Sequence, residues 1–118
     1  MQFAAVLYEG CTLVNTTPHA INVLDYRTHE VRFSIPAAPQ PLRLEERLEH
    51  VGNLAGVPLV RKSLVANISL PEPQEGVFYV VPLAVAQMLQ RPDFVVPDDL
   101  VRDDQGRVIG CRRFATVI

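Results

Sequence analysis

The sequence predicts a mostly β protein of the α+β class: an antiparallel sheet of short strands with one short helix at about residues 82–91. Apolar and polar residues alternate over Ala20–Asp25 and Glu30–Ile35, which is the period of half-buried strands. Ten prolines divide the rest of the chain into short segments. Only residues 82–91 hold a run of good helix formers between two prolines.

The length and composition are typical of one globular domain, so we expect residues 1–118 to fold as a single domain. No apolar run approaches the ~20 residues that span a bilayer. The first residues lack the basic segment of a signal peptide. We therefore expect a cytoplasmic protein with no membrane partner. Cys11 and Cys111 are expected to be buried hydrophobes in a reducing compartment, and a disulfide between them would need an oxidising one.

The first half of the chain predicts strands at residues 2–8 and 12–15, separated by a turn at Glu9 and Gly10. The alternating segments 20–25 and 30–35 predict an antiparallel hairpin. Residues 36–41 are too rich in proline for a central strand and form a stiff connector.

In the second half we expect strands at residues 42–44, 57–62, 64–70 and 77–81, with a mixed polar stretch at 45–50. The helix at 82–91 is apolar over most of its surface, so it must be covered by a loop or by another subunit. A short strand at 94–96 follows. The turn Asp103–Gly106 then joins strands at 100–102 and 107–114.

The aspartates of the C-terminal segment raise the question of catalysis. Asp98, Asp99, Asp103 and Asp104 could hold a divalent metal or act in acid–base chemistry. Neighbouring aspartates on a strand point to opposite faces, however, and the second pair suits a turn. The histidines have no metal-ligand spacing, and no nucleophile elbow, phosphate loop or dinucleotide fingerprint is present. The expectation is a non-enzyme without a metal or cofactor.

Three groups of residues could instead bind a small anionic ligand. Asn15, Thr17 and His19 lie at one strand end, where they could bond ribose or phosphate oxygens or satisfy their own turn. One of Phe78 and Tyr79 is expected in the core, and the other could stack on a base.

The third group is charged. Arg102, Arg107 and Arg112 could clamp phosphates, and they could equally pair with nearby aspartates such as Asp98. The net charge of −2 argues against a nucleic-acid polymer as partner.

Three segments carry a family resemblance: residues 15–19 (NTTPH), 70–81 (LPEPQEGVFYVV), and 96–111, which begins VPDD and ends GC. In this order they resemble a family of small phage and prophage proteins over residues 13–114, which makes residues 1–12 an N-terminal extension. The chain is also similar to the first type of Thoeris anti-defence sponge proteins. That resemblance implies an oligomer that binds cyclic ADP-ribose isomers or cyclic oligonucleotides without cleaving them.

The leading hypothesis is therefore a phage-encoded protein of the bacterial cytoplasm that sequesters cyclic nucleotide immune signals as a homo-oligomer. The predicted ligand-binding residues are Asn15, Thr17, His19, Phe78, Tyr79, Asp98, Arg102, Arg107 and Arg112. Two alternatives stay open. One is a small phage structural or protein–protein interaction factor, and the other is a metal-dependent nucleotide-processing enzyme.

Overall fold

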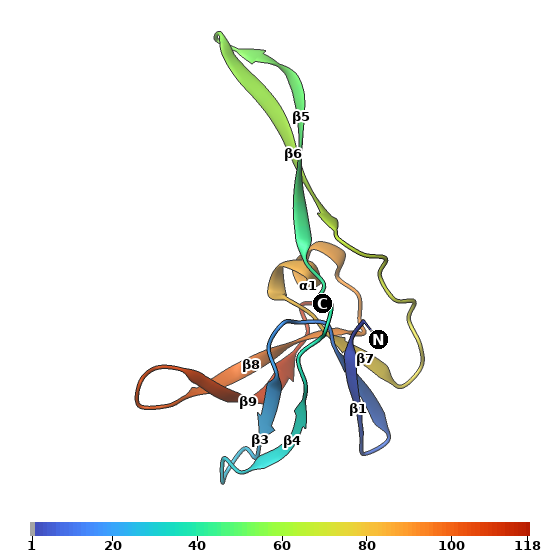
Figure 1. The fold of residues 1–118 in the computed structure, drawn as a ribbon, viewed down its shortest axis with the longest axis vertical. Helices are drawn as coiled ribbons and strands as arrows, with labels where there is room; N and C mark the ends of the chain where they lie inside the picture. Colours follow the sequence, from blue (N-terminus) through green and yellow to red (C-terminus); the bar gives the residue numbers. More distant parts are fainter. Residues whose placement is uncertain (1) are drawn as a thin grey trace. The chain divides into compact units, whose positions relative to one another are not determined.

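A computed structural model describes residues 2–118 and shows two compact units (Figure 1). The main unit runs to Pro41 and resumes at Glu72, and the hairpin unit is Leu42–Pro71. The elements are β1 (Ala4–Tyr8), β2 (Cys11–Asn15), β3 (Ile21–Leu24), β4 (Val31–Ile35), β5 (Leu44–Leu54), β6 (Val57–Ala66), β7 (Val77–Val80), α1 (Leu83–Leu89), β8 (Phe94–Arg102) and β9 (Val108–Ala115). The single domain stays a prediction.

The main unit holds a seven-stranded sheet in the order β1-β2-β7-β8-β9-β3-β4. The predicted class, mostly β with one short helix, is confirmed. The predicted antiparallel pairing is only partly right, because β2–β7, β7–β8 and β3–β9 are parallel. The helix α1 explains one of these pairs: a helical crossover returns the chain to the end of the sheet from which β7 started, so β8 runs in the same direction.

The sheet curls until its two edge strands approach each other, which gives a nearly closed barrel. Tyr8 of β1 stacks on Phe33 of β4 with 4.3 Å between ring centroids. The Arg32 guanidinium lies 5.6 Å from the centre of the Tyr8 ring. The edge strand β1 falls within the predicted extension of residues 1–12, and it pairs along its whole length with β2.

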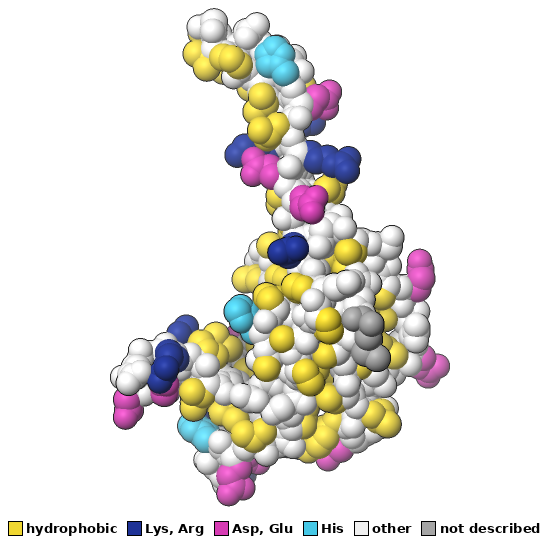
Figure 2. Space-filling model, in the orientation of Figure 1, with side chains coloured by type: hydrophobic (Ala, Val, Ile, Leu, Met, Phe, Trp, Pro, Cys, Tyr) yellow, Lys and Arg dark blue, Asp and Glu magenta, His cyan; other side chains and the backbone are white. Residues whose placement is uncertain are grey.

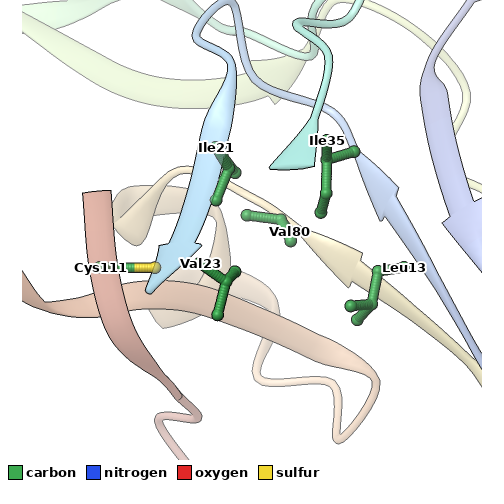
Figure 3. Packing of buried hydrophobic residues seen from close by; sticks show 6 residues of the cluster. All are labelled: Leu13, Ile21, Val23, Ile35, Val80 and Cys111. Atoms are coloured by element: carbon green, nitrogen blue, oxygen red, sulfur yellow. The ribbon is translucent and has the colours of Figure 1, made fainter. Parts of the chain in front are cut away.

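The core of the main unit lies inside this curved sheet (Figure 3). Side chains from five strands meet there: Leu13, Ile21, Val23, Ile35, Val80 and Cys111. Cys111 is buried as the sequence predicts, and Cys11 is half-buried against the same cluster. Both cysteines are free thiols.

The helix α1 lies within the predicted range but is shorter. Pro82 is its N-cap with extended backbone angles, and Gln90 ends it in a left-handed conformation. Val85 and Ala86 are buried, whereas Leu83 and Met88 stay exposed. The chain itself therefore covers one side of the helix, and cover by another subunit stays a prediction. Among residues 2–118, no helix is long and apolar enough to cross a membrane.

The hairpin unit is a two-stranded antiparallel sheet of β5 and β6. Residues 45–50, expected as a mixed polar stretch, continue the strand, because both faces are exposed and burial imposes no alternation on them. Ala55 and Gly56 form the tip with φ of 52° and 79°. Positive φ at both central residues is typical of the hairpin turn whose twist matches that of the strands.

Candidate functional site

The hairpin of β8 and β9 sorts its charged residues onto two faces. Asp98 lies opposite Arg113 in the ladder, and Leu100 lies opposite Cys111. Because side chains alternate along a strand, Asp99 and Arg112 share the other face. Arg113 Nε donates to Asp98 Oδ2 at 2.7 Å, and Arg112 Nη2 lies 2.8 Å from Asp99 Oδ2. Asp98 and Asp99 are adjacent in the chain, but each forms an ion pair with a different arginine.

The turn between β3 and β4 is held rigid by one carboxylate. Asp25 Oδ1 accepts hydrogen bonds from the backbone N–H groups of Arg27 at 2.8 Å and Thr28 at 3.0 Å. These donors hold the pKa of Asp25 below its ordinary value. The backbone N–H of His29 donates to the carbonyl of Asp25 at 3.1 Å. Tyr26 and His29 are thus presented on an ordered loop.

This turn and the β8–β9 hairpin together form a site that we call the Arg112 cluster: Tyr26, His29, Asp99 and Arg112. The Arg112 guanidinium lies 5.4 Å from the centre of the Tyr26 ring. Its Nη1 is 3.4 Å from His29 Nε2. Its Nε is buried and has no hydrogen-bond partner among the described residues. Tyr26 itself is 69% exposed, so its ring is open to solvent.

Electrostatics keep the pair at the centre of the cluster charged. The hydrogen bond from Arg112 is the main reason that the pKa of Asp99 lies below its ordinary value, and His29 adds a smaller contribution. Asp99 in turn raises the pKa of Arg112. Asp99 and His29 both have left-handed backbone angles, with φ of 52° and 62°. Such angles are uncommon outside glycine and gather at functional sites.

The cluster offers the chemical groups that a nucleotide needs. An exposed aromatic ring stacks on bases, a guanidinium binds phosphate, and a carboxylate accepts hydrogen bonds from ribose hydroxyls. Residues 2–118 contain no group of three or more His, Cys, Asp or Glu side chains able to hold a metal ion.

Three of the predicted ligand-binding residues lie together at the end of β2. The Asn15 side chain is fully buried, and its Nδ2 donates to the carbonyls of His19 at 2.8 Å and Pro36 at 3.0 Å. Its Oδ1 accepts from the backbone N–H and the hydroxyl of Thr17. His19 is exposed. The amide of Asn15 therefore links the β2–β3 connection to the segment that directly follows β4.

As expected, one of Phe78 and Tyr79 points into the interior and the other points outward. Tyr79 is buried, meets Phe94 edge to face and donates its hydroxyl to the carbonyl of Glu72. Phe78 is partly exposed on β7. Phe78 is thus the member of the pair that remains available for stacking.

The remaining predicted residues belong to the β8–β9 hairpin. The turn Asp103–Gly106 is confirmed: Gly106 N–H donates to the carbonyl of Asp103 at 3.0 Å. Arg107 pairs with Asp103 at 3.1 Å, and Arg102 donates to the carbonyl of Gly106 at 2.9 Å. Both arginines therefore stabilise their own turn. Of the nine predicted residues, Arg112 is the one that joins the cluster.

The sequence reasoning missed Tyr26, His29 and Asp99 as ligand-binding candidates. Alternation across the predicted hairpin could have placed Asp99 on the face of Arg112. The turn of Tyr26 and His29 reaches this face because β3 pairs with β9 in parallel through Val23 and Cys111. A pairing between strands so far apart in the chain leaves no local signal.

No family model, curated protein or solved structure matches this chain.

Proposed function

We propose that this protein is a phage- or prophage-encoded binding protein that sequesters small anionic nucleotides, namely cyclic ADP-ribose isomers or cyclic oligonucleotides, without cleaving them. The observation that carries the proposal is the Arg112 cluster, where an exposed tyrosine ring lies beside a guanidinium, an imidazole and a carboxylate. The resemblance to the sponge proteins that the sequence suggests, itself a prediction, implies the same class of ligand.

Each member of the cluster has a role that its position allows. Tyr26 provides a ring for a base. Arg112 and His29 face a phosphate together, since Arg112 Nη1 and His29 Nε2 are close to each other. Asp99 holds the guanidinium in place with both of its oxygens, and each oxygen keeps a lone pair that can accept a hydrogen bond from a ribose hydroxyl. The ligand adds to a preformed ion pair, which limits the ordering cost of binding.

Two groups that could drive turnover are poorly suited to it, which supports binding without cleavage. The lowered pKa of Asp99 makes this carboxylate a weak base, and a general base works best with a pKa near the working pH. Burial raises the pKa of the Cys111 thiol, so the nucleophilic thiolate is disfavoured.

Retention of ligand tests the proposal. The purified full chain is incubated with cyclic ADP-ribose isomers and cyclic dinucleotides, filtered to remove free ligand and then heat-denatured. Recovery of intact ligand from the protein fraction is expected. A chemically altered ligand would indicate an enzyme, and the absence of retention would reject nucleotide binding.

Two variants locate the site. Arg112→Gln is expected to abolish retention, because it removes the charge that faces the phosphate. Arg113→Gln is the matched control: it changes the neighbouring arginine, which has its own aspartate partner and points to the other face. Equal loss in both variants would place the ligand elsewhere.

The alternative of a protein–protein interaction factor is favoured by a different observation, the exposed apolar side chains of the hairpin unit. These side chains support association with a protein surface and say nothing about nucleotides, so the two functions are compatible.

A further inference from the structure

The Arg112 cluster contains one imidazole, that of His29, beside an ion pair whose two charges cancel. Arg112 Nη2 lies 2.8 Å from Asp99 Oδ2. An imidazole is the side chain whose charge changes close to neutral pH. Figure 2 shows side chains of both charges on the β8–β9 hairpin at the lower left, with a histidine exposed on the surface below them. The protonation of His29 therefore decides whether the cluster as a whole is neutral or positive.

The contact with Arg112 determines the protonation of His29 in the free chain. Arg112 Nη1 lies 3.4 Å from His29 Nε2. A guanidinium nitrogen donates hydrogen bonds and has no lone pair to accept one, so His29 Nε2 is the acceptor. A ring nitrogen that accepts carries no proton, which places the single ring proton on Nδ1. The ring that makes this contact is neutral.

A phosphate held between Arg112 and His29 reverses the requirement at Nε2. The oxygens of an ionised phosphate accept hydrogen bonds and donate none. Arg112 keeps its role, because its N–H groups donate to a phosphate oxygen as they do to the imidazole. Nε2 of the neutral ring, however, turns a lone pair toward that oxygen, and two lone pairs repel each other. A proton on Nε2 converts this contact into a charge-assisted hydrogen bond.

Charge balance favours a doubly protonated ring over a neutral ring whose proton has moved to Nε2. The charges of Asp99 and Arg112 cancel, so a bound phosphate gives the cluster a net negative charge. A negative charge within ~4–6 Å favours the charged form of an imidazole. A proton taken up by His29 offsets the charge of the phosphate.

The other charged groups around His29 keep their charges in this pH range. Those of its own turn are Asp25, Arg27 and Glu30. Asp99 faces the ring from β8 and Arg112 from β9, whereas Arg113 points to the other face of the hairpin. Carboxylates and guanidinium groups ordinarily ionise far from neutral pH. A change in the charge of the cluster near neutral pH therefore belongs to the imidazole.

We infer that His29 binds the phosphate of the nucleotide as an imidazolium, so that binding takes up a proton from solution. The hydrogen bond from Arg112 Nη1 to His29 Nε2 breaks, the proton adds to Nε2, and the new N–H donates to a phosphate oxygen. Release of the nucleotide returns the proton to solution. This inference rests on the proposed function and adds a pH dependence to it: the cluster holds nucleotides more tightly as the pH falls.

Titration of the full chain with cyclic ADP-ribose isomers and cyclic dinucleotides at two pH values tests the coupling. The phosphates of these ligands keep their charge across the range. The affinity of the wild type is expected to be roughly fivefold or more greater at about pH 5.5 than at about pH 8.5. Calorimetry in buffers of different ionisation enthalpy is expected to show proton uptake on binding.

Two variants assign the effect to one ring. His29→Asn removes the ionisable group and keeps the turn, because asparagine tolerates the left-handed backbone of this position, where φ is 62°. Its affinity is expected to be nearly the same at both pH values. His50→Asn is the matched control: it is the same substitution at an exposed histidine of the hairpin unit, and it should keep the pH dependence of the wild type.

The outcomes separate this inference from the proposed function. Binding of equal strength at both pH values, or an equal pH dependence in wild type and His29→Asn, would overturn the proton uptake and leave nucleotide binding in place. Absence of binding by the wild type at both pH values would reject the proposed function and this inference together.

Nitrogen NMR of the imidazole rings provides a second test, which begins with the free chain at about pH 7.5. The signals of His29 are identified by their absence in His29→Asn. The free protein is expected to carry the ring proton on Nδ1, and saturation with nucleotide is expected to protonate both ring nitrogens. A proton on Nε2 in the free chain, or a ring that keeps a single proton when nucleotide is bound, would contradict the inference.

Discussion

At the scale of single residues, the pairing of Asp99 with Arg112 determines both the geometry of the cluster and its response to acid. The pKa of Asp99 is lowered in the folded chain, mainly by the hydrogen bond from Arg112. The unfolded chain therefore takes up a proton first as the pH falls. The pair contributes stability above the ordinary aspartate pKa of about 3.9, and this contribution is lost as the pH falls through the lower pKa of the folded state.

We predict that Asp99→Asn removes part of this acid sensitivity. Below about pH 4, the free energy of unfolding of the wild type should fall with decreasing pH more steeply than that of the variant. Urea denaturation at several pH values measures the difference. Asp104→Asn, in the exposed turn of the same hairpin, is the control. Equal slopes for wild type and Asp99→Asn would contradict the assigned pairing.

Asn15 was predicted to bind ligand, but its contacts in the structure give more support to a structural role. Its amide spans two carbonyl acceptors and one backbone donor in a fully buried position. Asn15→Asp would place a carboxylate against the carbonyls of His19 and Pro36. We expect a loss of roughly 2–3 kcal/mol in the free energy of unfolding.

Thermal and urea denaturation measure this loss. Asn22→Asp is the matched control, because Asn22 also donates to a carbonyl, that of Ile109, but is only half-buried. A loss for Asn15→Asp no larger than that of the control would show that the buried amide is not a structural tie.

At the scale of elements, the approach of β3 to β9 determines whether the Arg112 cluster forms. Gly110 on β9 allows this approach: a Cβ at this position would lie 2.8 Å from the backbone oxygen of Asn22 and 2.8 Å from Leu24 Cγ. The parallel pair that brings the Tyr26–His29 turn to Arg112 therefore depends on a residue without a side chain.

We predict that Gly110→Ala destabilises the main unit by about 1–3 kcal/mol, the usual cost of overpacking. It should also separate the turn from the hairpin, so nucleotide retention falls with it. Ile109→Ala, at the exposed neighbouring position, should cost less. Denaturation curves measure stability. An unchanged denaturation midpoint for Gly110→Ala would show that β3 and β9 do not pack as closely as the short distances at Gly110 indicate.

Some elements were predictable because their signal is local. The alternation of Val31, Phe33 and Ile35 predicts β4, and a proline before a run of helix formers predicts α1. The β8–β9 turn follows from Asp103 and Gly106. The polar run at residues 45–50 gave no such signal, because an exposed two-stranded hairpin imposes no burial pattern on its sequence.

At the scale of the whole molecule, the parallel pairings lay beyond prediction. Alternation identifies a strand but not the direction or identity of its partner, so the places of β7 between β2 and β8, and of β9 beside β3, carry no local signature. The candidate site depends on the second of these pairings. For this reason the sequence predicted Arg112 as a ligand-binding residue but did not predict that Tyr26 and His29 lie beside it.

Binding of a cyclic nucleotide by the Arg112 cluster can be measured by equilibrium titration of the intact chain. Cyclic ADP-ribose isomers and cyclic dinucleotides are titrated into wild type, Arg112→Gln and Arg113→Gln, with thermal unfolding as the check on folding. We predict saturable binding by wild type and Arg113→Gln and at least a hundredfold weaker binding by Arg112→Gln. Undetectable binding by the wild type, or equal binding by all three folded proteins, would contradict nucleotide binding by the Arg112 cluster.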